Sequence, residues 1–282
     1  MKSILAVAGE GILRPLPLYE TAIHVAKRFG GRIVGLNTVT AEYSMMFTAD
    51  LGFALPAEVD RSLDHESHKR RASARAQFEA FMLDHGVTIG PPSPDRATAE
   101  WREENGRQDA VVGALGRIYD LIVVERPDKL ASLAEATLED ALFESGRPVL
   151  MAPVSPPASL GERILVAWNG STETACTVGL AMPFLKRAQK VDVVSVADAM
   201  VPGPSGEDLA RSLAAHGISV TARHITGRSG PAGQIFLDEA KTIGADLLIK
   251  GAYTQSRLRQ LIFGGATRHI IMAAEIPVLL AH

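Results

Sequence analysis

The segment Lys250-Gly-Ala-Tyr-Thr-Gln-Ser-Arg-Leu-Arg-Gln-Leu-Ile-Phe-Gly-Gly-Ala-Thr267 carries the most information about this chain. An apolar, strand-like run precedes it, so Gly251 falls at the end of a strand, and Gly264 and Gly265 stand directly before a helical stretch. Glycine lets a backbone approach a phosphate closely, and the N-terminus of a helix offers unpaired N–H groups and the positive end of its dipole. The pattern favours a nucleotide cradle, and two ordinary tight turns in an α/β domain are the alternative.

The chain contains the same series of segments twice. Four stretches recur in the same order in both halves, so a chance similarity is a poor explanation. The pairs are Ser3–Gly9 with Arg163–Asn169, Asp84–Val87 with Ala215–Ile218, Asp120–Val124 with Asp246–Lys250, and Arg147–Ala152 with Ile276–Ala281. Between the copies, residues 153–160 have the Pro- and Ser-rich composition of a linker. We therefore predict two domains, residues 1–153 and 161–282.

Each copy alternates short apolar runs with helical stretches, which is typical of a parallel sheet buried between helices. The strands predicted in the second copy are Ile164–Trp168, Val191–Val196, Ser219–Ile225, Asp246–Ile249 and Pro277–Leu280. The helices predicted there are Thr172–Lys186, Glu207–His216, Pro231–Ile243 and Ala266–Ala274. The strands predicted in the first copy are Ile4–Ala8, Arg32–Val39, Gly86–Ile89, Leu121–Val124 and Pro148–Met151. The predicted fold class is α/β, with two tandem, doubly wound, five-stranded parallel-sheet domains.

Composition excludes several classes of function. A formal net charge of −3 argues against nonspecific DNA binding, which needs a strongly basic face. Cys176 is the sole cysteine, so an internal disulfide and a zinc site made of cysteines are excluded. No apolar run approaches the ~20 residues that cross a bilayer. We therefore expect a cytoplasmic protein with neither a nucleic-acid nor a membrane partner.

A ligand of a doubly wound sheet binds at the carboxyl ends of its strands. In the second copy this edge carries Asn169, which either hydrogen-bonds a ribose hydroxyl or base edge or belongs to the N-cap region of the next helix. The backbone N–H groups at the start of the last helix, together with a nearby arginine, are the candidate phosphate ligands. These are Gly264, Gly265, Ala266 and Thr267, with Arg257, Arg259 or Arg268 supplying the charge.

Two patterns in the second copy resemble the universal stress protein family. One is an apolar strand followed by Gly251, Gly264-Gly265, a helix and Pro277-Val-Leu, and the other is Ile164-Leu-Val-Ala-Trp-Asn-Gly-Ser171. The order of elements extends this resemblance to nearly the whole chain, whereas the specific motifs are confined to the second copy. The resemblance implies two Rossmann-like, nucleotide-binding α-hydrolase-like domains that pack as a pseudo-dimer through their last strands. Assembly of two chains into a homodimer and binding of an unknown protein partner are further possibilities.

The family's nucleotide contacts fall, residue by residue, on Asn169, Gly251, Thr254, Gly264, Gly265 and Ala266. The chain departs from the family pattern at three of them, because Thr254 replaces a glycine, Gly265 replaces a hydroxyl residue and Asn169 replaces an acidic residue. The resemblance implies a stress-responsive sensor that binds ATP or AMP, with magnesium when the ligand is ATP. The alternatives are an interaction protein with a degenerate cradle and a slow nucleotide hydrolase, although no catalytic residue or metal site is visible.

The first copy has a long insertion at residues 40–66, which predicts a loop or lid, an extra piece of core, or a site for an apolar ligand. Its cradle is replaced by Glu125-Arg-Pro-Asp-Lys129, which cannot present open N–H groups to a phosphate. Trp101 is placed before the third helix of this copy, where it either stacks on a ligand or packs against the insertion. His65 and His68 are either metal ligands or a solvated helix start, and the second reading is favoured.

Overall fold

The computed structural model describes residues 1–8, 16–39, 57–127, 132–252 and 265–282, with the backbone alone for 57–67. The amino-terminal half contains β1 (Ser3–Val7), α1 (Leu16–Phe29), β2 (Arg32–Val39), α3 (Ala57–Asp84), β3 (Thr88–Ile89), β4 (Thr98–Asn105), α4 (Gln108–Leu115), β5 (Leu121–Val124), α5 (Leu133–Glu144) and β6 (Val149–Met151). The carboxy-terminal half contains β7 (Arg163–Ala167), α6 (Thr172–Leu185), β8 (Lys190–Val196), α7 (Gly206–Ala214), β9 (Val220–Ile225), α8 (Ala232–Ile243), β10 (Leu247–Gly251), α9 (Gly265–Ala273) and β11 (Val278–Ala281).

The described strands form one sheet in the order β3-β4-β2-β1-β5-β6-β11-β10-β7-β8-β9. Each half winds outward from its first strand in both directions, so β1 lies between β2 and β5, and β7 lies between β8 and β10. Apart from β3, the two halves therefore have the same strand order, and all pairs within each half are parallel. The predicted doubly wound α/β class is confirmed.

The two halves join through their last strands, β6 and β11, which are the one antiparallel pair among the described strands. Leu150 lies opposite Leu279, with Met151 opposite Val278 and Val149 opposite Leu280. The expected side-by-side arrangement of the last strands is confirmed. This pairing hides two edges that would otherwise be free to pair with other chains.

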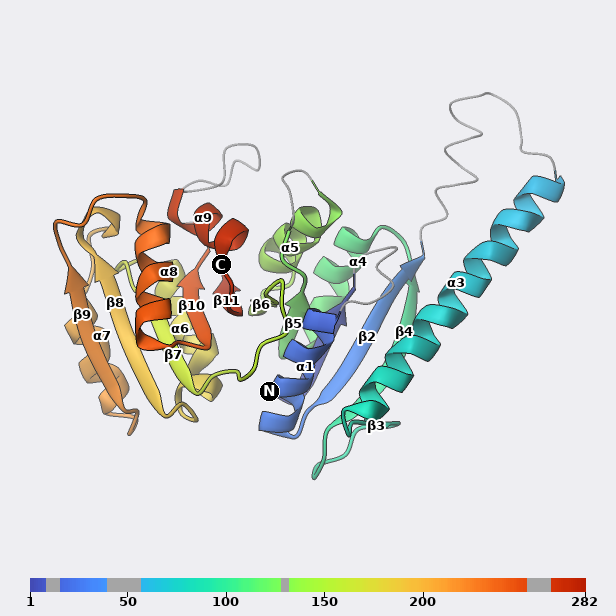
Figure 1. The fold of residues 1–282 in the computed structure, drawn as a ribbon, viewed down its shortest axis with the longest axis horizontal. Coiled ribbons are helices and arrows are strands. Elements are labelled where there is room, and N and C mark those ends of the chain that lie inside the picture. Colours follow the sequence, from blue (N-terminus) through green and yellow to red (C-terminus); the bar gives the residue numbers. More distant parts are fainter. Residues whose placement is uncertain (9–15, 40–56, 128–131, 253–264) are drawn as a thin grey trace.

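Helices cover both faces of the sheet (Figure 1). One apolar cluster packs α1, α3, α6 and α7 against one face, and a second packs α4, α5, α8 and α9 against the other. Successive strand residues point to opposite faces, so Ile4 belongs to the first cluster and Leu5 to the second. Both clusters contain residues from both halves, so the core is continuous across the β6–β11 junction.

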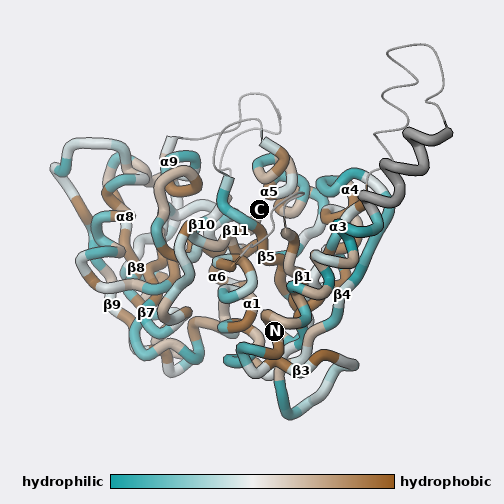
Figure 2. Tube along the Cα trace, turned by 45° about the vertical axis from the view of Figure 1, so that its right-hand side comes forward, coloured by the Kyte–Doolittle hydropathy of each residue, from teal (hydrophilic) through white to brown (hydrophobic). Residues whose placement is uncertain are grey.

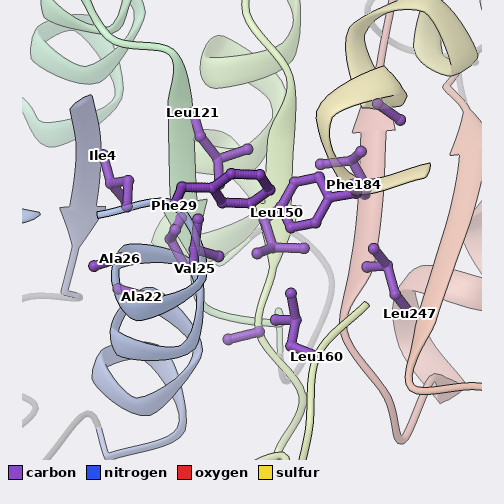
Figure 3. Packing of buried hydrophobic residues seen from close by; sticks show 14 of the residues in the cluster. Ile4, Ala22, Val25, Ala26, Phe29, Leu121, Leu150, Leu160, Phe184 and Leu247 are labelled. Atoms are coloured by element: carbon purple, nitrogen blue, oxygen red, sulfur yellow. The ribbon is translucent and has the colours of Figure 1, made fainter. Parts of the chain in front are cut away.

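Side chains of α1 and α6 meet where the halves join. Phe29 and Phe184 pack edge to face with ring centroids 5.0 Å apart, and Figure 3 shows them facing each other above Leu150. The Arg187 guanidinium lies 4.6 Å from the centroid of Phe29. Arg28 donates to Glu162 at 2.6 Å and to the Gly161 carbonyl at 2.9 Å. The junction therefore combines a dry aromatic contact with charged hydrogen bonds at its rim.

The third strand of the first half differs from its prediction. The segment predicted as Gly86–Ile89 forms only the two-residue β3, and the strand equivalent to β9 is β4, which pairs with β2 along eight residues. Its sequence, TAEWREEN, reads as a polar loop because its outer residues are charged, and Figure 2 shows β4 largely in the hydrophilic colour. Trp101 accordingly lies within β4, where its ring packs 5.3 Å from that of Phe78 of α3.

Part of the insertion at residues 40–66 is helical rather than a loop. Residues from Ala57 onward belong to α3, a 28-residue helix that runs along β4 and extends beyond the sheet at its start (Figure 1). Its last turns pack on the sheet through the buried Phe78 and Met82, and Gly35 in β2 leaves room for the Phe78 ring. Residues 40–56 lie outside the described residues.

Candidate functional site

The strand order places a candidate site at the carboxyl ends of β7 and β10. These neighbouring parallel strands continue into helices on opposite faces, β7 into α6 and β10 towards α9. Chain crossovers that leave in opposite directions open a crevice at the strand ends, where doubly wound proteins bind ligands. Since β10 and β11 are parallel, the helix between them, α9, starts at this edge.

The turn after β7 is held together by hydrogen bonds within the turn. Asn169 is buried, and its Oδ1 accepts from Thr174 Oγ1 at 2.7 Å and from the Ser171 N–H at 3.3 Å. Ser171 is the N-cap of α6, and its Oγ accepts from the Thr174 N–H. This geometry supports the N-cap interpretation of Asn169, because its oxygen already has two donors. A contact between Asn169 and a ribose stays a prediction.

Gly251 lets β10 pack directly against the first turn of α6. A Cβ built on Gly251 would lie 2.6 Å from Thr174 Oγ1 and 2.7 Å from the carbonyl carbon of Glu173. Both distances are far below van der Waals contact, so this position requires glycine for packing alone. On this face, the space expected for a ligand beside Gly251 is filled by α6.

The loop after β8 covers the same turn from the other side. Gly203 packs against the backbone of Gly170, which has a φ of +82°, and the Val201 N–H donates to the Asn169 carbonyl at 2.9 Å. The Trp168 indole N–H donates to the Pro204 carbonyl at 2.9 Å. The backbone of the turn after β7 is thus held by contacts from the loop after β8.

The start of α9 is the open part of the site. Gly265 is exposed, and a Cβ added to it would meet no atom of the described residues within 4 Å. Ala266 is half-buried, Thr267 is buried, and Arg268 is exposed. The first turn of α9 contains no acidic residue. Its N–H groups and positive dipole end are consequently not neutralised by a carboxylate of their own turn.

Three of the predicted contacts lie outside the described residues, namely Thr254, Arg257 and Gly264, and so does Arg259. The structure brings Asn169 and Gly251 to one edge, where α6 links them through Thr174. Gly265, Ala266 and Thr267 open the helix that leaves the same edge.

Lys250 is a candidate residue that the sequence reasoning did not select. It is 3% exposed, and its Nζ donates to the Gly251 carbonyl at 3.0 Å. Burial lowers the pKa of its ammonium to about 8, opposed by the nearby negative charge of Glu173. A charged residue in the otherwise apolar strand LLIKG is the signal that could have identified it, because fully buried lysines are rare.

The corresponding strand end in the first half has an apolar residue instead of a lysine. Val124, the last residue of β5, corresponds in register to Lys250 of β10. A small cavity lies beside Val124 between the starts of α4 and α5. The cavity is lined by Val7, Gln108, Val124, Glu125, Ala134 and Thr137. The start of α5 is neutralised internally, since Ser132 caps it and Glu135 stands in its first turn. The first half therefore lacks the electropositive edge of the second.

Contacts from the first half hold both ends of the β10–α9 unit. Arg126 Nη1 donates to the Ala274 carbonyl at 3.0 Å, just beyond the end of α9. The ring of His282 packs edge to face on Phe143 of α5, with centroids 4.8 Å apart, and its Nδ1 lies 3.3 Å from the Ala252 carbonyl. The first half thus contacts the residue that follows α9 directly, and it reaches Ala252, before the predicted cradle, through His282.

The Gly227–Gly233 segment is a structural connection. Gly227 and Gly230 have positive φ angles, and a Cβ on Gly233 would lie 2.6 Å from the Ala266 carbonyl oxygen of α9. Arg228 pairs with Glu239 at 2.9 Å and with Asp238 at 3.1 Å. The glycines of this segment therefore form a turn and allow α8 and α9 to pack closely. This supports the interpretation of the segment as a structural connection.

The described part of the chain contains no group of three or more His, Cys, Asp or Glu residues placed to hold a metal ion. His68 is exposed, and the side chain of His65 lies outside the described residues. None of the helices in the described ranges is long and apolar enough to cross a membrane.

Comparison with known proteins supports one family for the second half. Residues 161–282 match the model of the Universal stress protein family. A search of curated proteins found no match. A universal stress protein from Archaeoglobus fulgidus DSM 4304 superimposes with a TM-score of 0.68 at 15% identity, covering 99% of this chain and 95% of that one.

Two proteins from Pseudomonas aeruginosa give weaker superpositions. A putative universal stress protein from strain UCBPP-PA14 has a TM-score of 0.55 at 17% identity, covering 100% of this chain and 93% of that one. A functionally unknown protein from strain PAO1 has a TM-score of 0.54 at 15% identity, with coverage of 100% and 92%. Residues 161–282 thus carry a universal stress protein domain, and the whole chain shares the fold of solved universal stress proteins.

Proposed function

We propose that the carboxy-terminal half binds an adenine nucleotide, ATP or AMP, and that the chain is a tandem universal stress protein that senses this nucleotide during stress. Magnesium would accompany ATP. In this proposal the first half is a diverged second copy that serves as a partner or regulatory surface. The match of residues 161–282 to the family model is the basis of this proposal. The proposal adds the nucleotide ligand and assigns different roles to the two halves.

The open start of α9 carries the proposal. Gly265 is exposed at the ligand-binding edge of a doubly wound sheet, and no acidic residue stands in the first turn of its helix. An N-terminus of this kind attracts a phosphate through its N–H groups and its dipole. The helix starts of α5 and α6, by contrast, are capped by Ser132 and Ser171.

Equilibrium binding of labelled ATP tests the proposal. We expect saturable binding by the wild type and by Gly265→Ala, because a Cβ at Gly265 meets none of the described residues. Gly265→Asp should bind at least about tenfold more weakly, since a carboxylate at the start of a helix occupies the position of the phosphate charge. Absence of saturable binding to the wild type at millimolar ATP would refute the proposal.

A second candidate function is an interaction protein that binds no nucleotide. It is favoured by the internal contacts of Asn169 and Gly251, which occupy two of the six positions where the family contacts its ligand. Mass spectrometry of small molecules released from denatured, purified protein discriminates between the two. A stoichiometric amount of an adenine nucleotide supports the sensor function. In a separate activity assay, product formation from ATP with magnesium or manganese would support slow hydrolysis instead.

A further inference from the structure

A buried lysine stands at the carboxyl edge of the sheet in the second half, and no ion pair holds it among the described residues. Lys250 lies on the same face of β10 as Leu248, which is the face covered by α8 and α9. Its side chain is 3% exposed, and its one hydrogen bond among the described residues is to the Gly251 carbonyl. An ammonium has three N–H donors, so two are unused there.

The fold itself does not require a lysine at this position. The first half has the same strand order and ends its corresponding strand with the fully apolar Val124. Burial of an unpaired ammonium is unfavourable, whereas an apolar side chain at the same place contributes to the core. Lys250 therefore reduces stability relative to its counterpart, which indicates a role in binding rather than in folding.

The surroundings of Lys250 add positive potential. The helix α9 starts at the same edge and has no acidic residue in its first turn, so the positive end of its dipole is not neutralised there. The start of α6, which contacts the neighbouring Gly251, is capped by Ser171 and carries Glu173 in its first turn. Glu173 in α6 is the nearby carboxylate, and its negative charge acts on Lys250. Its buried Oε2 accepts no hydrogen bond within the described ranges. Among the described residues, the positive groups of this edge are therefore Lys250 and the start of α9.

We propose that the Lys250 ammonium is an anion-binding group that contacts a phosphate of the ligand held at the carboxyl edge of β7 and β10. This inference rests on the proposed nucleotide function for the identity of the ligand, but the phosphate contact itself does not require an adenine ring. Binding of a phosphate supplies acceptors for the two N–H donors that have none among the described residues, together with a negative charge in direct contact with the ammonium. It makes Lys250 the residue that distinguishes phosphorylated ligands from adenosine.

The experiment compares three ligands with three forms of the full chain. Wild type, Lys250→Met and Lys241→Met are titrated with ATP, adenosine and pyrophosphate by isothermal calorimetry. Lys241 is exposed in the last turn of α8, so its variant controls for the loss of one positive charge from the protein. Methionine has the length of the lysine stem without the charge, which makes Lys250→Met a matched test.

We expect Lys250→Met to lose about 10- to 100-fold in affinity for ATP and pyrophosphate, the size of one lost charge-assisted hydrogen bond. Adenosine affinity and the Lys241→Met control should stay near wild type. Unchanged ATP and pyrophosphate affinity in Lys250→Met would overturn the role of Lys250 while leaving the nucleotide function intact. Binding of pyrophosphate through Lys250 without any ATP or adenosine binding would overturn the nucleotide function alone, and a wild type that binds none of the three would overturn both.

A measurement on the wild type does not depend on the folding of a variant. Lysine labelled with 13C at Cε reports its protonation state by NMR, and the Lys250 resonance can be assigned from its absence in Lys250→Gln. Addition of pyrophosphate should move the Lys250 titration to higher pH, since a bound anion stabilises the ammonium. A Lys250 titration that is unaffected by saturating pyrophosphate would contradict the contact.

Discussion

Replacement of Lys250 by methionine should stabilise the protein near neutral pH. Burial lowers the Lys250 pKa from 10.5 to about 8, and one pKa unit corresponds to about 1.4 kcal/mol, so the folded state carries a penalty of about 3 kcal/mol when the amine is charged. Methionine removes this penalty but also removes the hydrogen bond to Gly251, which is worth about 1 kcal/mol. The expected net gain in the free energy of unfolding is about 2 kcal/mol.

The pH dependence of this gain follows from the direction of the pKa shift. Below the folded pKa of about 8, Lys250 is charged in both states and the penalty is fully present. As pH rises through the window from there to 10.5, the unfolded chain keeps the proton and the folded chain releases it, so the wild type gains stability. The advantage of Lys250→Met should therefore shrink across this window and be small above it.

Urea unfolding followed by circular dichroism at pH 7 and at pH 10.5 measures the difference. Other groups also titrate in this range, so the relevant quantity is the difference between the two lysine variants. Lys241→Met, an exposed control, should be neutral at both pH values. If Lys250→Met were destabilising by the same amount at both pH values, the argument that Lys250 carries a burial penalty would be wrong.

Further outcomes can be checked on the same preparations. Phe184→Ala should lower the free energy of unfolding by about 3–5 kcal/mol, because it empties the aromatic contact with Phe29 between the halves, and urea unfolding measures the loss. Gly251→Ala should cost about 1–3 kcal/mol without any ligand, since its methyl group overlaps the first turn of α6, and the thermal midpoint should fall. Arg126→Ala should weaken ATP binding severalfold through the position of α9 with no direct ligand contact, and an unchanged dissociation constant would refute that coupling.

The sequence predicts the fold well where an apolar run is bounded by clear helix signals. The strand Arg32–Val39 has the predicted bounds, and α8 ends at Gly244 with a φ of +65°, as a C-terminal glycine indicates. The internal repeat adds information that no single segment carries, because the second copy shows how many strands the first must contain. It also places the junction at β6 and β11, which the resemblance implied.

The missed strand has a physical cause. Residues 98–105 pair with β2 over their full length, but their exposed side chains are charged, and a pattern with three glutamates and an arginine resembles a loop. The same copy uses Gly86–Ile89 only as a short edge strand beside it. Pairing along the backbone does not depend on side-chain hydropathy, so an outer strand of this kind is found only by comparison with the second copy.

The candidate site was less predictable because its glycines serve two purposes. Sequence spacing selects Gly251 for close approach to a phosphate, whereas the structure uses its missing side chain for contact with Thr174. The same ambiguity applies to Asn169, whose oxygen is an N-terminal hydrogen-bond acceptor for α6. Spacing alone cannot separate ligand contact from helix packing, since both require small or polar residues at strand ends.

A difference between the two copies identifies function better than a motif does. Both copies keep the residues that build the sheet, so a position where the fold accepts an apolar side chain in one copy and a buried charge in the other is not explained by folding. Val124 and Lys250 form such a pair, at corresponding strand ends and on the same side of their sheets. The buried charge lowers stability, and the contacts of Arg126 and Phe143 hold the unit that carries it. We infer that the first half supports, through the shared sheet, a site that the second half would maintain less securely alone.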